Sequence, residues 1–188
     1  MGYSTMKRDH SHYAGQIGGL GGKNTNDLAK ETDLAIAVGT KLADFTTGSW
    51  ANFENENFKL VSINVSRFDA NKHMAQAVVG DAKVSLTELS RVLGDWKVRD
   101  EWNEKSQKEL KIWNEHIDKE SAPTNQEIPS YIQVIGAIYR NSDPNDIAVT
   151  AAGGLVGEVV QVWRPKELNT HESCLLYTSD AADECSCV

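Results

Sequence analysis

Asp33-Leu34-Ala35-Ile36-Ala37-Val38-Gly39-Thr40 is the stretch of sequence that decides the fold. It is a short, nearly all-apolar run that ends in Gly-Thr and opens into the polar loop 41–49. Such runs are typical of parallel strands that helices cover on both faces. We therefore expect a fully buried parallel strand here, and a ligand-facing loop at its carboxyl end, because open α/β sheets bind ligands there.

The segments that follow this strand repeat the α/β pattern. Apolar and β-branched residues predict a second strand at 59–66 and a brief third strand at 77–79. The chain between the first two strands is long enough for a helical crossover beginning near Thr46, which a parallel pair requires. Asp81 is a good N-cap for a further helix, and Gly94 ends it. The sequence thus predicts a doubly wound, mostly parallel, Rossmann-like sheet.

The segment before the first strand is rich in glycine, with five glycines in residues 9–22. Gly19-Leu20-Gly21 is reminiscent of a dinucleotide-binding loop, but that fingerprint needs a strand directly before it, and no such strand is visible. We favour a tight connection into a short helix that Asn24 or Thr25 caps. A nucleotide cradle is the alternative.

The composition changes after the first α/β pattern. Residues 100–119 are highly charged, with Trp102, Leu110, Trp113 and Ile117 at helical spacing, which predicts a helix docked along one stripe. Residues 121–129 have the composition of a linker. A new α/β unit follows, with a helix at 131–140, a turn at 143–145 and a buried strand at 147–151.

Glycines follow the carboxyl end of the strand at 147–151, in Ala152-Gly153-Gly154-Leu155-Val156-Gly157. Glycines at such a place let backbone amides approach an anion or a cofactor ring, so this is the best candidate ligand site by geometry. A plain turn from strand to helix is the alternative.

Length, charge and cysteine content exclude several classes of protein. The chain has 188 residues, a net charge of −8 and no basic block, which argues against nucleic acid or an anionic membrane as a partner. No apolar run is long enough to cross a bilayer and no secretory signal is visible, so we expect a cytoplasmic protein.

His10-Ser11-His12 lacks further metal ligands, and all three cysteines fall in residues 174–188. We predict no metal site and no catalytic side chain.

Three separated motifs resemble the thiamine diphosphate-dependent enzymes of the acetolactate synthase type. They are Gly15–Gly48 with its Asp-Leu-Ala-Ile-Ala-Val-Gly-Thr strand, Ile63-Asn64-Val65-Ser66-Arg67-Phe68-Asp69-Ala70, and Ala151-Ala152-Gly153-Gly154 followed by Trp163-Arg164-Pro165. The details are most similar to the inositol-catabolic branch of the family, and the likeness covers residues 1–172.

The resemblance implies a fragment of a larger enzyme. It assigns 1–97 to part of a middle domain, 98–128 to a connector helix and linker, and 129–173 to the start of a diphosphate-binding domain. It also implies thiamine diphosphate and Mg²⁺ as cofactors of the parent enzyme, with Ala152, Gly153, Gly154 and Leu155 on the cofactor side. The family's activating glutamate and its metal-binding motif are not among the residues of this chain, so the resemblance implies a chain that is inactive by itself.

The implied activity of the parent enzyme is hydrolysis of a carbon–carbon bond in a small cyclic 1,2-dione, by a homo-oligomer. An acyl-transferring relative of the acetolactate synthase type and a non-catalytic nucleotide-binding module are the alternatives. Residues 174–188 resemble a translated sequencing adaptor, and we expect this tail to be non-native.

Overall fold

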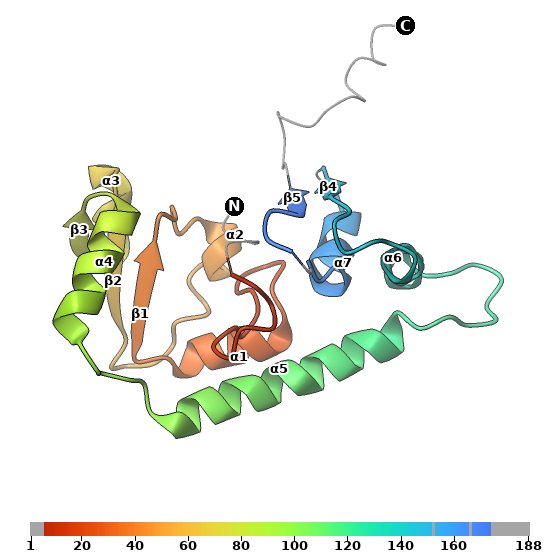
Figure 1. Ribbon diagram of the computed structural model, residues 1–188, viewed down its shortest axis with the longest axis horizontal. Helices are drawn as coiled ribbons and strands as arrows, with labels where there is room; N and C mark the ends of the chain where they lie inside the picture. Colours follow the sequence, from red (N-terminus) through yellow and green to blue (C-terminus); the bar gives the residue numbers. More distant parts are fainter. Residues whose placement is uncertain (1–5, 152, 166, 174–188) are drawn as a thin grey trace, which may run out of the picture.

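Two small α/β units lie along one long helix in the computed structural model, which describes residues 6–151, 153–165 and 167–173 (Figure 1). The long helix is α5, Asp100–Glu120, and it runs beneath both units. The first unit holds a three-stranded sheet of β1, Leu34–Val38, β2, Lys59–Asn64, and β3, Gln76–Val79. The second holds the pair β4, Ala148–Thr150, and β5, His171–Ser173. All paired strands are parallel, which confirms the predicted α/β class.

Helices of different length connect and flank these strands. The first unit contains α1, Lys23–Glu31, α2, Asp44–Thr47, α3, Arg67–Ala70, a 3-10 turn at Lys72–Met74, and α4, Ala82–Leu93. The second unit contains α6, Tyr131–Arg140, and α7, Leu155–Val162. The crossover between β1 and β2 is mostly irregular, since only the single turn of α2 is helical, where a longer helix was expected.

The strand β1 differs from the prediction of a fully buried strand. The sheet order is β1-β2-β3, so β1 lies at an edge. Leu34, Ile36 and Val38 share one face, and their exposed fractions are 47%, 44% and 37%. The prediction was wrong because, within the described residues, β1 has a pairing strand on only one side and no helix packs extensively against it, although its composition is that of an interior strand.

The ends of two helices test the capping predictions. The Asp81 carboxylate accepts a hydrogen bond from the Val84 amide at 2.9 Å, and Gly94 ends α4 with a positive φ of 54°, as expected. The expected cap of α1 was wrong, because Gly22 is its N-cap. Thr25 Oγ1 instead donates to the Ala14 carbonyl at 2.9 Å, which ties the helix to the preceding loop.

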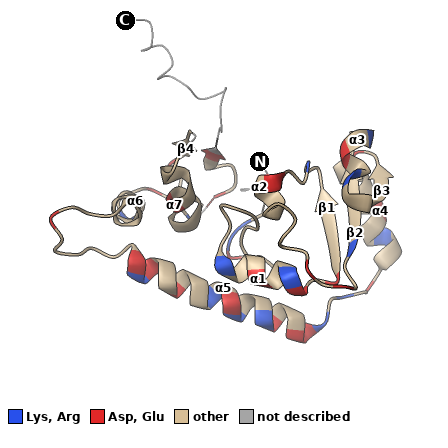
Figure 2. Cartoon of the chain, turned by 180° about the vertical axis from the view of Figure 1, so that it is seen from behind, with Lys and Arg blue, Asp and Glu red and all other residues tan. Residues whose placement is uncertain are grey.

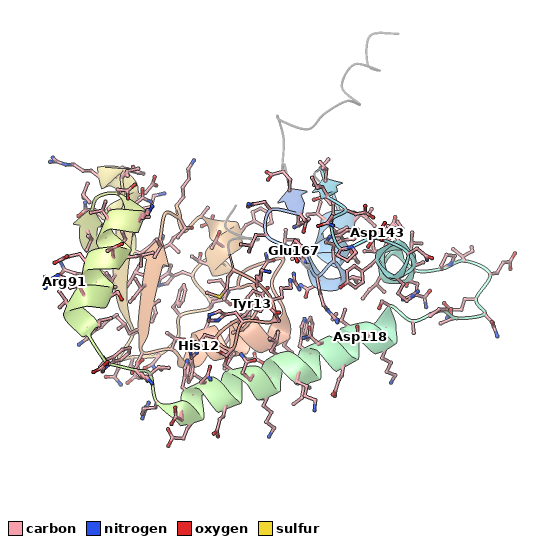
Figure 3. The ribbon with its side chains drawn as sticks, viewed as in Figure 1. His12, Tyr13, Arg91, Asp118, Asp143 and Glu167 are labelled. Carbon is pink, nitrogen blue, oxygen red and sulfur yellow. The ribbon has the colours of Figure 1, made fainter. Side chains whose placement is uncertain are left out.

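The second unit packs its core against the carboxyl half of α5. Ile117 of α5 is buried with residues of α6, α7 and the segment after α7, namely Ile135, Val159, Val162 and Trp163. Polar contacts continue this interface. Arg164 pairs with Asp118 at 2.8 Å, near the carboxyl end of the helix (Figure 3).

The outer surface of α5 carries acidic and basic residues in alternation (Figure 2). Its apolar stripe is only partly covered, since Ile117 is buried while Trp102, Leu110 and Trp113 are half-buried. The helix predicted at 100–119 is confirmed, and it contacts both units. Among the described residues, no helix combines the length and apolar character needed to cross a bilayer.

Candidate functional site

The predicted cofactor site lies where β4 passes into α7. Gly153 has a φ of +117°, a conformation that L side chains rarely adopt, and Gly154 is the N-cap of α7. Leu155 is the first residue of the helix and is partly exposed. The structure thus brings three of the four predicted residues together at one turn. The fourth, Ala152, lies outside the described residues.

Space around this turn is open. A Cβ atom built on Gly153 or Gly154 would have no neighbouring atom within 4 Å among the described residues. No side chain caps the amino end of α7, and the first amides of a helix carry partial positive charge. A ligand could therefore approach the backbone closely, which fits one wall of a site for an anionic or ring-shaped group.

The elements on both sides of the turn hold two buried polar atoms with no hydrogen-bond partner in the described part of the chain. They are Thr150 Oγ1 at the end of β4 and Glu158 Oε2 on α7. Buried polar atoms are nearly always paired in folded proteins. This unit therefore has unused hydrogen-bonding capacity close to the predicted site.

The glycine-rich loop before α1 is packed against the protein. The amides of Gly18 and Gly19 donate to Asn26 Oδ1 at 2.8 Å and to the Phe45 carbonyl at 2.7 Å, and the amides of Gly21 and Gly22 donate within the loop. A Cβ on Gly18 would lie 2.0 Å from the Phe45 carbonyl oxygen. These glycines allow close backbone packing, and their amides are already occupied, so the geometry favours the tight connection over the nucleotide cradle.

The carboxyl edge of the first sheet is likewise held by internal bonds. Asn64 Nδ2 donates to the Thr40 carbonyl at 3.1 Å, and Asn64 Oδ1 accepts from the Ser66 amide at 2.9 Å. The side chain of Asn64 therefore fixes the loop after β1. The loop after β1, which was predicted to face a ligand, is thus attached to the end of β2 by the hydrogen bond between Asn64 and Thr40.

Titratable side chains give no metal centre in the described residues. His12 lies above α5 (Figure 3), where its Nδ1 is 2.9 Å from Asn103 Oδ1, and its amide donates to His10 Nδ1. No group of three or more His, Cys, Asp or Glu side chains lies together in the described part of the chain. The three cysteines all fall outside it.

One histidine in the second unit has an unusual environment. His171 of β5 is buried, and burial together with the nearby Arg8 guanidinium lowers its pKa from 6.5 to about 4. The imidazole is therefore neutral at pH 7. It lies on the strand that pairs with β4 and belongs to the framework of the predicted site.

Comparison with known proteins identifies the first half of the chain. Residues 1–89 match the family described as thiamine pyrophosphate enzyme, central domain. These residues belong to the thiamine pyrophosphate enzyme family. The match covers the three-stranded sheet and most of α4, which are the elements that the sequence assigned to a middle domain.

Several curated proteins match nearly the whole chain. A 3D-(3,5/4)-trihydroxycyclohexane-1,2-dione hydrolase of Clostridium tetani is 32% identical over 96% of this chain and 33% of its own length. The protein of the same name from Geobacillus thermodenitrificans is 31% identical over 94% of this chain and 31% of its own length. A third hydrolase of this name, from Bacillus cereus, is 30% identical over 94% of this chain and 32% of its own length. The chain spans about a third of the length of these relatives.

Proposed function

We propose that this chain is a fragment of a thiamine diphosphate-dependent hydrolase that cleaves a carbon–carbon bond in a cyclic 1,2-dione during myo-inositol catabolism. The observation that carries the proposal is the similarity of nearly the whole chain to three hydrolases named for this type of substrate. The similarity extends over both α/β units and the helix between them. It therefore supports a common activity more strongly than similarity of one unit alone would.

The described residues fit one part of a cofactor site. Gly153 and Gly154 leave room for a ligand, and the uncapped amino end of α7 favours negative charge there. When bound, thiamine diphosphate supplies the carbanion chemistry that carbon–carbon cleavage requires. In this proposal the backbone of 153–155 contacts the cofactor, whereas Mg²⁺ ligands and the activating acid come from other parts of a longer polypeptide in a homo-oligomer.

The proposal divides the parent subunit into regions. Residues 1–97 form part of the middle domain, 98–128 connect the domains, and 129–173 begin the diphosphate-binding domain. Residues 174–188 are a non-native tail. Sequencing the source DNA across codon 174 in independent isolates tests this last point, since the same tail in every isolate would contradict it.

The decisive experiment uses the complete open reading frame that contains this sequence. The purified full-length protein, with thiamine diphosphate and Mg²⁺, is offered either the trihydroxycyclohexane-1,2-dione or pyruvate. We expect a ring-opened deoxy sugar acid from the dione and no product from pyruvate. Acetolactate from pyruvate, without turnover of the dione, would show an acyl transferase instead.

The 188-residue chain alone is the companion sample. We expect no turnover of the dione, because its described residues present no group of metal-ligating side chains and only one wall of the cofactor site. Turnover by the chain alone would contradict the division of the active site among several regions of the enzyme.

A further inference from the structure

A cavity remote from the turn between β4 and α7 opens beside the amino ends of β2 and β3. Its volume is about 540 Å³, within the range of small-molecule sites. Trp50, Phe58, Leu60 and Met74 give it apolar walls, and Lys59 and Gln76 are among its polar lining residues. The family assignment and the proposed function leave this cavity without a role.

The walls of this cavity are formed by aromatic rings in fixed mutual geometry. The rings of Trp50 and His73 stack with their centroids 4.0 Å apart and 20° between their planes. Phe58 meets Trp50 edge-on at 6.2 Å, and Phe53 stacks behind Phe58 at 4.6 Å. Offset and edge-to-face contacts of this kind hold rings in place. Leu60 is buried beside them.

Hydrogen bonds hold these aromatic residues in an unusual backbone conformation. Trp50 and His73 have φ angles of +72° and +57°, which bulky residues rarely adopt. The Trp50 amide donates to Thr47 Oγ1 at 3.1 Å, and His73 Nε2 lies 3.1 Å from the Leu42 carbonyl oxygen, to which it donates. Strained conformations of this kind persist where surrounding contacts fix them, and they gather at ligand-binding sites.

Two further features of the cavity indicate what it binds. The Met74 side chain is fully exposed beside the rings, and the flexible thioether of methionine packs readily against aromatic groups. Lys59 and no acidic side chain line the cavity, although acidic residues outnumber basic ones 27 to 19 in the chain. Lys59 forms no ion pair with any described residue, so its charge is available to an anion.

We propose that this cavity binds a planar aromatic ring that carries an anionic group. The ring lies against Trp50 and Phe58, Met74 packs over it, and the anionic group pairs with the Lys59 ammonium at the rim. This ligand is chemically distinct from the non-aromatic dione of the proposed function, and the proposal holds whether or not that function is correct.

The test titrates the full chain with 2-naphthoate and follows the indole N–H signals of its tryptophans by NMR. The Trp50 signal is assigned from Trp50→Phe. We expect it to shift and to saturate, with a dissociation constant of about 1 mM or below for a ligand of this size. The uncharged 2-naphthalenemethanol should bind at least five-fold more weakly. A saturating shift confined to other tryptophans, such as the exposed Trp96, would overturn the proposal.

Surface variants separate the proposed contacts from effects on folding. Lys59→Gln should remove the preference for naphthoate over the alcohol, whereas Lys83→Gln, an exposed lysine on α4, should leave it unchanged. Met74→Ala alters a fully exposed side chain, so the fold is retained, and binding should weaken at least three-fold. Unchanged naphthoate affinity in both Lys59→Gln and Met74→Ala would show that the ligand binds elsewhere.

Discussion

Individual glycines in this chain serve two different purposes, and the structure distinguishes them. Gly18 has a positive φ and also lies against the backbone of Phe45. Gly153 has a positive φ but open space around it. The sequence predicted special glycines in both places. It favoured a tight connection at the first place and a ligand site at the second, but it could not identify the neighbour of Gly18, because Phe45 lies 27 positions further along the chain, in α2.

Alanine substitutions test this distinction. Gly18→Ala should destabilise the chain by about 3 kcal/mol or more, because the added Cβ would lie 2.0 Å from the Phe45 carbonyl oxygen in a strained backbone. Gly153→Ala should cost only about 1 kcal/mol, from strain alone. Urea denaturation measures both changes, and equal losses in the two variants would argue against close packing at Gly18.

His171 makes the stability of the second unit depend on pH. Its pKa is about 4 in the folded chain against 6.5 ordinarily, so the unfolded chain binds more protons between these values. The stabilisation is therefore complete above about pH 6.5 and is lost as the pH falls towards 4. Urea midpoints at pH 7.5, 5.5 and 4.0 measure it, with hydrogen exchange in α7 as a local probe.

The matched variant for this measurement is His171→Gln, which cannot titrate. Its midpoint should change less between pH 6.5 and 4 than that of the unaltered chain. Arg8 and Glu172 act on the histidine with opposite effects on its pKa, and both remain in the variant. The hydrogen bond from Lys72 lowers the pKa of Asp69. Protonation of carboxylates of this kind therefore destabilises the chain only at lower pH. An identical pH profile in His171→Gln would assign the dependence to other groups.

Among the elements, the sequence located the longer helices and most strands well, whereas the predicted burial of β1 and of the strand at 147–151 was wrong. The apolar composition of β1 and β2 located both strands within two residues at each end, since β-branched runs between polar loops specify extended structure locally. Burial depends on what packs outside the strand, which local composition does not contain. The brief β5 was missed because His171–Ser173 has no apolar pattern, although it pairs with β4.

The exposed edge of β1 should make the isolated chain associate. An uncharged edge strand without proline offers its free amides and carbonyls to another copy. Ile36→Lys places a charge in the exposed row of β1 and should shift the chain towards monomer in sedimentation velocity experiments. Because Ile36 is already partly exposed, the fold should be retained.

Val65→Lys is the matched control for β1, since Val65 is also exposed but follows β2. It should leave association unchanged. Equal association of the unaltered chain and the Ile36→Lys variant would show that β1 is not the contact surface.

At the scale of the whole molecule, the two units meet through a small set of polar contacts above α5. Trp113 Nε1 donates to Gln161 Oε1 at 3.1 Å, and Gln161 Nε2 donates to the Leu20 carbonyl at 2.6 Å. This chain of bonds joins α5, α7 and the loop before α1. Sequence alone predicted the connector helix but not these contacts, because they join residues up to 141 positions apart.

Gln161→Ala should loosen the attachment of the second unit without unfolding the first. Hydrogen exchange should become faster in α7, by about five-fold or more for the loss of roughly 1 kcal/mol per partly buried bond, and stay unchanged in β2. Gln107→Ala is a suitable comparison, because Gln107 of α5 donates to the Tyr13 carbonyl in the first unit and forms no hydrogen bond with the described residues of the second. Equal effects of both variants on α7 would mean that the Gln161 bonds do not hold the units together.

The helix α5 also sets the angle at which one unit faces the other. Its first half contacts the first unit, as in the Lys105–Glu31 pair, and its last turns carry Ile117 and Asp118 beneath the second. One residue inserted between these contacts would rotate the second unit by about 100° and advance it by about 1.5 Å. Seven added residues, close to two full turns, would nearly restore the original orientation of the second unit relative to the first, with the two units further apart along the helix. In evolution, changes in the length of this helix are therefore expected in near-whole turns, so that the open turn at Gly153 keeps its orientation.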